Sequence, residues 1–98
     1  MAIETRLFDP SEYLDTDEGV QAYLEDAFAS GDAAEIADAL GVVARAIGMT
    51  RIAERAGISR QALYKALDRG SHPEFETIIK VAAALGFRLV PERIATPA

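Results

Sequence analysis

The sequence contains no cysteine and no tryptophan, and its single histidine is His72. Without cysteine the chain forms neither disulfides nor thiolate metal sites, and one histidine is too few to build a metal cluster. No apolar run in the sequence is long enough to span a membrane, and no basic-then-apolar leader begins it. We therefore expect a cytoplasmic protein that holds no metal and no cofactor.

Basic residues are scarce in the first part of the chain. Residues 1–38 hold eleven acidic residues and one arginine, a net charge of −10, whereas residues 39–98 hold nine basic and five acidic residues, a net charge of +4. Because phosphates repel acidic surfaces, we expect the acidic part to face away from any nucleic acid. Two interpretations stay open for it: a solvated surface that keeps the chain soluble, or a contact surface for a basic partner.

Apolar residues recur at helical rather than alternating spacing, so we expect an all-α fold with about five helices. One helix runs from the capping residues Asp15–Asp17 to about Ser30, a second from about Ala33 to Ile47, and a last one from Pro73 until Gly86 closes it. The inward positions of the second and last of these helices are Ile36, Leu40, Val43, Ala44, Ile47, Phe75, Ile78, Ile79, Ala82 and Leu85. Candidate short β-strands lie near the two ends, at 3–8 and 87–90.

The segment from Met49 to Leu67 has the pattern of a helix-turn-helix, which places its second helix in the DNA major groove. Ile52 and Leu63 provide apolar positions on the two helices, and Gly57 suits the left-handed turn between them. Ser59 follows as a candidate N-cap for the second helix. A plain helical hairpin has the same spacing, but the exposed face of the second helix favours DNA binding because no acidic residue interrupts it before Asp68.

Residues at the start of the second helix are the candidates for reading bases. Arg60 can pair with guanine and Gln61 with adenine, and Tyr64 lies one turn further on, either facing the bases or with its ring half-buried. Candidate phosphate contacts lie at the helix N-termini, in the second helix and in the following loop: Thr50, Arg51, Ser59, Lys65 and Arg69. Arg45 and Arg55 are expected only to balance nearby acids, and His72 to act as a loop or capping residue.

With these elements in place, the chain resembles the phage-repressor-like (Cro/C1, or XRE) helix-turn-helix family. A narrower resemblance, to the probable addiction-module antidote proteins of the HigA antitoxin type, covers nearly the whole chain. It is carried by the segments Thr5–Pro10, Glu12–Leu14, Ala22–Ala27, Gly48–Ala53, Gly57–Leu67 and Pro73–Thr77. His72 stands where these proteins usually have asparagine, and Arg51 where they often have glutamine.

The resemblance implies a lambda-repressor-like domain at 32–90 with an acidic N-terminal extension at 1–31 packed on it. We expect the tail at 91–98 to be frayed, as chain ends commonly are. It also implies two activities without catalysis: neutralisation of a small basic RelE/HigB-like toxin, and repression of the chain's own operon by a homodimer bound to operator DNA. We expect the toxin to contact acidic residues of the extension, namely Asp15, Asp17, Glu25 and Asp26. The alternatives are a stand-alone repressor without a toxin, and an interaction module that does not bind DNA.

Overall fold

The computed structural model describes residues 14, 16–68 and 70–95. Within them the chain forms five helices and no strand: α3 (Asp17–Ala29), α4 (Ala33–Ile47), α5 (Met49–Ala56), α6 (Arg60–Ala66) and α7 (Phe75–Ala84). The expected all-α class is therefore confirmed, and α4 begins and ends where the sequence predicted, at Ala33 and Ile47. The candidate strand at 3–8 and the first capping residue, Asp15, lie outside the described residues.

Short polar side chains begin the first two described helices. The hydroxyl of Thr16 accepts a hydrogen bond from the Gly19 amide at 2.9 Å, and a carboxylate oxygen of Asp32 accepts one from the Ala34 amide at 2.9 Å. Each cap satisfies a backbone donor that has no partner inside the helix. Because capping depends on neighbours in the sequence alone, both helix starts could be predicted.

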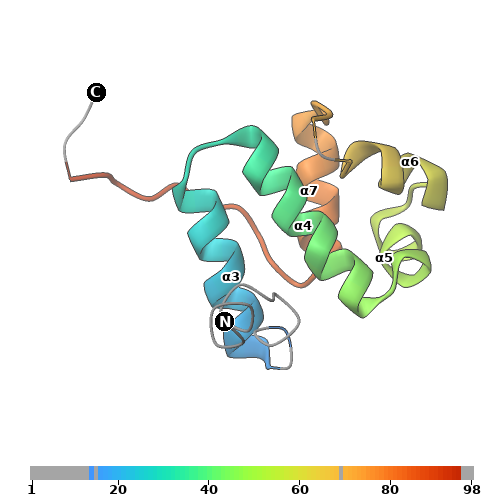
Figure 1. Ribbon diagram of the computed structural model, residues 1–98, viewed down its shortest axis with the longest axis horizontal. Helices are drawn as coiled ribbons and strands as arrows, with labels where there is room; N and C mark the ends of the chain where they lie inside the picture. The colour runs from blue at the N-terminus through green and yellow to red at the C-terminus, as the bar shows by residue number, and fades with distance from the viewer. Residues whose placement is uncertain (1–13, 15, 69, 96–98) are drawn as a thin grey trace, which may run out of the picture.

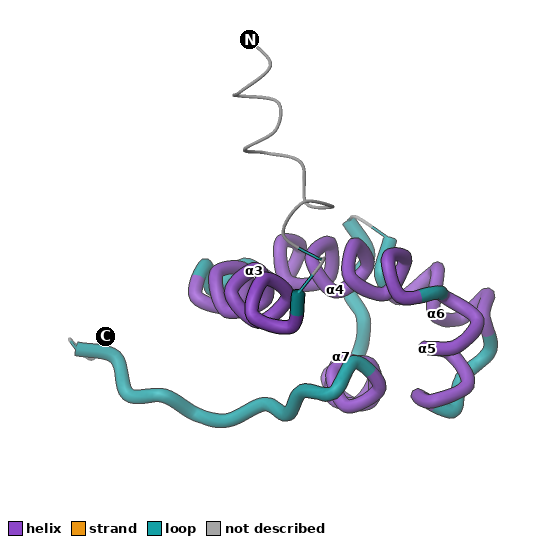
Figure 2. The backbone as a smooth tube through the Cα atoms, turned by 90° about the horizontal axis from the view of Figure 1, so that it is seen from below, coloured by secondary structure: helices purple, strands orange, loops and turns teal. Residues whose placement is uncertain are grey.

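The helices pack around one apolar core in which α4 and α5 are central. Helix α3 packs on α4, α4 also contacts α5 and α7, and α5 contacts α6 and α7. Figure 1 shows α3 and α6 at opposite ends of the molecule with α4 between them, and Figure 2 gives the same order from a perpendicular direction. The fold thus separates the acidic helix α3 from α6, the expected DNA-reading helix.

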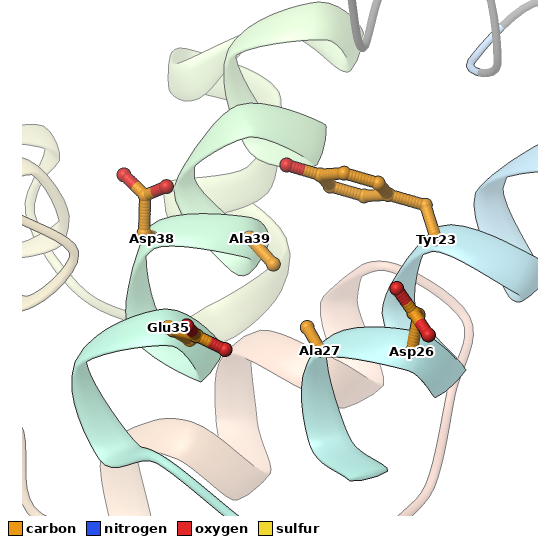
Figure 3. A pocket seen from close by; sticks show the side chains of 6 residues that line it. All are labelled: Tyr23, Asp26, Ala27, Glu35, Asp38 and Ala39. Carbon is orange, nitrogen blue, oxygen red and sulfur yellow. The ribbon is translucent and has the colours of Figure 1, made fainter. Parts of the chain in front are cut away.

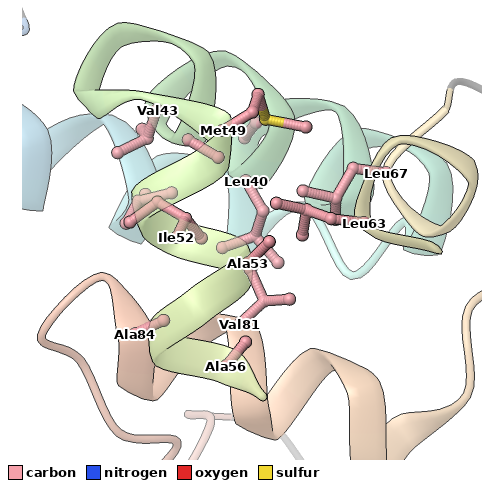
Figure 4. Close-up of a cluster of buried hydrophobic side chains, with 13 residues drawn as sticks. Leu40, Val43, Met49, Ile52, Ala53, Ala56, Leu63, Leu67, Val81 and Ala84 are labelled. Carbon is pink, nitrogen blue, oxygen red and sulfur yellow. The ribbon is translucent and has the colours of Figure 1, made fainter. Parts of the chain in front are cut away.

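Side chains from four helices meet in the centre of this core (Figure 4). Leu40 of α4, Ile52 of α5, Leu63 of α6 and Val81 of α7 are all completely buried. Burying a side chain of this size contributes about 1.5–3 kcal/mol to the stability of the fold. These contacts fix α5 and α6 against α4 and α7, so the exposed side of α6 rests on a rigid support.

Three of the predicted inward positions are exposed instead. Ile47 is 38% exposed, Phe75 69% and Ile79 45%. Helix α7 faces the core with Val81, Ala82 and neighbouring positions, and Phe75 and Ile79 lie one turn apart on its flank. At Phe75 and Ile79 the prediction failed because apolar residues occupy more than one side of α7. Ile47 is the last residue of α4.

Two further expectations about the C-terminal region are also wrong. Helix α7 begins at Phe75 rather than at Pro73, because Glu74 at its N-cap has an extended backbone with ψ 151°. The candidate strand 87–90 is an extended segment without strand pairing among the described residues. Its first amide, from Phe87, donates instead to the carbonyl of Ala82 at 2.8 Å and closes the end of α7. Beyond it the segment leaves α7 and extends toward the end of the molecule where α3 lies (Figures 1 and 2).

Candidate nucleic-acid interface and partner surface

Helix α6 is positioned by its turn and its cap. Gly57 has φ +73° and ψ 28°, the left-handed conformation in which a side chain would be strained. The Ser59 hydroxyl accepts a hydrogen bond from the Ala62 amide at 3.0 Å and begins α6. Both features were predicted, and together they make α5 and α6 two helices joined by a tight turn, consistent with a helix-turn-helix-like fold.

The outer side of α6 carries the predicted DNA-contacting side chains. Arg60, Gln61, Tyr64 and Lys65 are all exposed, whereas Leu63 is completely buried. Arginine and glutamine side chains can pair with base edges, and lysine can pair with phosphate. The structure thus brings these four side chains together on one short helix.

The Tyr64 ring is the meeting point of two arginine side chains. The guanidinium carbon of Arg60 lies 5.4 Å from the ring centroid, and that of Arg45, from α4, lies 5.9 Å from it. The Arg60 guanidinium also donates a hydrogen bond to the Tyr64 hydroxyl at 3.4 Å. Sequence reasoning missed the role of Arg45, because the approach of α4 to α6 is a tertiary feature that leaves no local signal.

Arg55 contacts the backbone of α7. Its guanidinium donates a hydrogen bond to the backbone carbonyl of Ala84 at 3.3 Å, at the C-terminal end of α7. A cation is favourable at this end of a helix, where backbone carbonyls lack partners within the helix. Arg55 therefore connects α5 to α7 and serves the fold.

The remaining candidate phosphate ligands lie at the start of α5 and beyond α6. Thr50 and Arg51 are exposed in the first turn of α5, which has Gly48 as its N-cap and no side-chain capping bond. Arg69 lies outside the described residues. In the same loop, the Ser71 hydroxyl donates to the Ala66 carbonyl at 2.8 Å and so closes the end of α6.

The predicted toxin-contacting residues lie on α3, apart from Asp15, which is outside the described residues. Asp17, Glu25 and Asp26 are exposed. Glu25 accepts a hydrogen bond from the Gln21 side-chain amide at 3.1 Å. These three acids do not share one face, because positions eight and nine residues apart are turned about 80° and 180° from the first in an α-helix.

Asp26 belongs to a hollow of about 260 Å³ between α3 and α4. Its lining is Tyr23, Asp26, Ala27, Glu35, Asp38 and Ala39 (Figure 3). The two acids of α4 were not predicted as part of this surface, since only the packing of α3 on α4 brings them beside Asp26. Burial, and secondly the negative charge of Asp38, raise the pKa of the Tyr23 hydroxyl above 10.0. The hollow is therefore an acidic depression with one neutral phenol.

Within the described residues, no group of three or more histidine, cysteine, aspartate or glutamate side chains is arranged to hold a metal ion. None of the described helices is long and apolar enough to cross a membrane. The features that stand out are thus two surfaces: a basic one that includes α6, and an acidic one on α3 and the N-terminal half of α4.

The fold and these surfaces define a small all-helical protein with a helix-turn-helix-like pair. Residues 4–92 match a family described as probable addiction module antidote protein, and the chain belongs to this family. It is also 41% identical over 88 residues to an uncharacterized protein of Haemophilus influenzae, a match that covers 90% of this chain and 91% of the relative. No solved structure matches the chain. Membership in the family supports an antitoxin role in general terms.

Proposed function

We propose that this chain is an antitoxin that neutralises a small basic RelE/HigB-like toxin and also represses its own operon as a DNA-bound dimer. The observation that carries the proposal is the separation of charge in a member of the antidote family. Acidic side chains gather on α3 and the first half of α4, and the exposed cations of α5 and α6 lie at the other end of the molecule. Two binding surfaces of opposite charge suit two partners of opposite charge. We propose a binding protein rather than an enzyme.

The DNA-binding part of the proposal rests on α6. Its exposed Arg60 and Gln61 stand in the first turn, the part of such a helix that meets base edges. Thr50, Arg51 and Ser59 lie at the two helix N-termini, where backbone N–H groups favour phosphate. We assign base contacts to the first pair, and phosphate contacts to the other three, to Lys65 and to Arg69.

The toxin-binding part rests on the acidic side chains of α3 and of the first half of α4. Asp17, Glu25 and Asp26 are exposed on α3, and Glu35 of α4 lines the same hollow as Asp26. A basic protein approaching this side gains favourable Coulomb energy that the DNA-facing side would not offer. The two partners would then occupy different ends of the molecule and need not compete.

A dimer is the form in which such a repressor reads a two-fold operator, with half-sites about one helical turn of DNA apart. Phe75 and Ile79 on the flank of α7, and Val90 in the following segment, are exposed apolar side chains. Apolar groups of this kind favour contact with another protein surface. We place the dimer contact in this region, which includes the last helix and the segment after it.

The DNA-binding part is tested with the double substitution Arg60→Ala and Gln61→Ala. Titration of the DNA upstream of the gene should show a loss of affinity of about 2–6 kcal/mol, since each specific contact is worth about 1–3 kcal/mol. The control is Gln21→Ala on α3, an exposed residue whose side-chain amide donates to Glu25 at 3.1 Å, and it should leave DNA binding unchanged. Equal affinity of the double variant and the wild type would contradict the assignment.

The toxin-binding part is tested by coexpression with the small basic protein encoded beside the gene. Copurification, and recovery of growth when both are expressed, are the expected results. Reversing the charges of Asp17, Glu25 and Asp26 should weaken this association and leave DNA binding nearly intact. Failure to copurify would favour the alternative, a stand-alone repressor. Loss of toxin binding and DNA binding together would indicate misfolding or a shared surface.

A further inference from the structure

Tyr64 differs from the other exposed residues of α6 because it contacts two arginine side chains of the protein itself. Its ring lies within 6 Å of two guanidinium carbons, and its hydroxyl accepts a hydrogen bond from Arg60. The residue is 38% exposed, so most of its surface is covered. Tyr64 is therefore engaged with protein groups on the surface that we propose faces DNA.

The position of Arg45 explains how α4 takes part in this contact. A Cβ atom built on Gly41, one turn earlier in α4, would lie 2.8 Å from an Nη atom of Arg45 and 3.3 Å from the backbone carbonyl of Leu67. The guanidinium of Arg45 thus occupies space that is open only because position 41 has no side chain. Gly41 is buried, so this space lies between α4 and the end of α6.

We propose that Tyr64 is a positioning residue that orients Arg60 for base reading, with Arg45 anchoring the ring to α4. This inference rests on the proposed DNA-binding function and replaces the prediction that Tyr64 itself reads a base. An arginine held over an aromatic ring has fewer rotamers to lose when it binds. The remaining guanidinium donors of Arg60 stay available for guanine, so the ring orients Arg60 without occupying the donors that bind the base.

The contact between the side chains is tested first in the free protein. Protons above an aromatic ring are shifted in the NMR spectrum, so the Nε–H and Cδ protons of Arg60 and Arg45 should show ring-current shifts. Tyr64→Leu should abolish these shifts, and Tyr64→Phe should keep them. Unshifted arginine protons in the wild type would overturn the proposed arrangement, whatever the DNA does. Because Tyr64 is at the surface, both variants are expected to fold, which thermal unfolding checks.

The role of the contact is tested with operator and non-operator duplexes. Tyr64→Leu should lower operator affinity roughly two- to tenfold, because the Arg60 side chain is then no longer restricted by the ring and loses more freedom on binding. Non-operator affinity and its salt dependence should stay unchanged. Tyr64→Phe should stay within about twofold of the wild type, since the ring is kept. The control Arg51→Ala should weaken binding to both duplexes and reduce the salt slope by about one.

Three outcomes of the duplex experiment would overturn the inference. If the wild type prefers operator DNA and Tyr64→Leu binds it equally well, Tyr64 does not position Arg60, although the proposed function stands. If Tyr64→Phe loses as much as Tyr64→Leu while the ring-current shifts persist, the hydroxyl reads a base directly. If the wild type binds neither duplex, the proposed DNA-binding function fails, and the role of Tyr64 in DNA recognition fails with it.

Discussion

Ser59 allows structural and DNA-contacting roles to be separated at a single position. Its hydroxyl caps α6 by accepting a hydrogen bond from the Ala62 amide at 3.0 Å, and we also assign it a phosphate contact. Replacing a capping serine by alanine costs about 1 kcal/mol of stability. In a chain of this length that corresponds to a fall in melting temperature of roughly 4–8 °C. Ser59→Ala should therefore unfold earlier than the wild type.

Ser59→Asp is the informative counterpart. Aspartate caps a helix about as well as serine, and its negative charge interacts favourably with the helix N-terminus, so stability should change by less than about 0.5 kcal/mol. The same charge would face a DNA phosphate at this position, and operator affinity should fall about tenfold, equivalent to about 1.4 kcal/mol. Thermal unfolding by circular dichroism measures the first quantity, and fluorescence anisotropy with labelled operator measures the second.

The two measurements on Ser59 refute different parts of the reasoning. If Ser59→Asp is destabilised as strongly as Ser59→Ala, the side chain does not serve as a cap that a carboxylate can replace. If Ser59→Asp is stable and binds operator like the wild type, no phosphate lies near this helix N-terminus. The second result would remove Ser59 from the interface and weaken the assignment of Thr50 and Arg51, which rests on the same argument.

Three further predictions concern the fold that supports these surfaces. Leu40 is completely buried, so Leu40→Ala should lower the free energy of unfolding by about 3–5 kcal/mol in urea titrations, and a loss below 1 kcal/mol would show that the core is loosely packed. Gly57→Ala should lower the free energy of unfolding by about 1–2 kcal/mol in the same assay. A Cβ there meets no atom within 4 Å, so the cost comes only from the strained backbone conformation at φ +73°. An unchanged free energy of unfolding would contradict the left-handed turn. Burial, and secondly Asp38, raise the pKa of Tyr23, so the folded state favours the neutral phenol. The contribution of Tyr23 to the stability of the fold is therefore present below pH 10 and is lost as the pH rises further. Tyr23→Phe should thus show a flatter decline in stability above pH 10 than the wild type, and identical slopes would refute the shift.

Local features of the fold could be predicted from the sequence. The caps at Thr16, Asp32 and Ser59 and the left-handed turn at Gly57 each depend on a few neighbouring residues, and the structure has all four. The same is true of the boundaries of α4, where a cap and a glycine enclose an apolar stripe. These elements carry their physical cause within the segment itself.

Features that depend on packing between helices could not be predicted. The sequence of α7 is apolar on more than one side, so its periodicity alone could not show that Phe75 and Ile79 face outward. The cluster of Arg45, Tyr64 and Arg60 arises where α4 approaches α6, and the sequence gives no sign of that approach. The acidic hollow likewise exists only because α3 packs on α4.

The central claim is that two partners bind at opposite ends of one small protein. Its most direct test is to add the neighbouring toxin to the chain already bound to operator DNA, and to determine the mass of the product by size-exclusion chromatography with light scattering. We expect one complex that contains operator, antitoxin and toxin together, because α4 separates α6 from the acidic helix α3. Release of DNA in step with toxin binding would contradict the claim and place both partners on a shared surface.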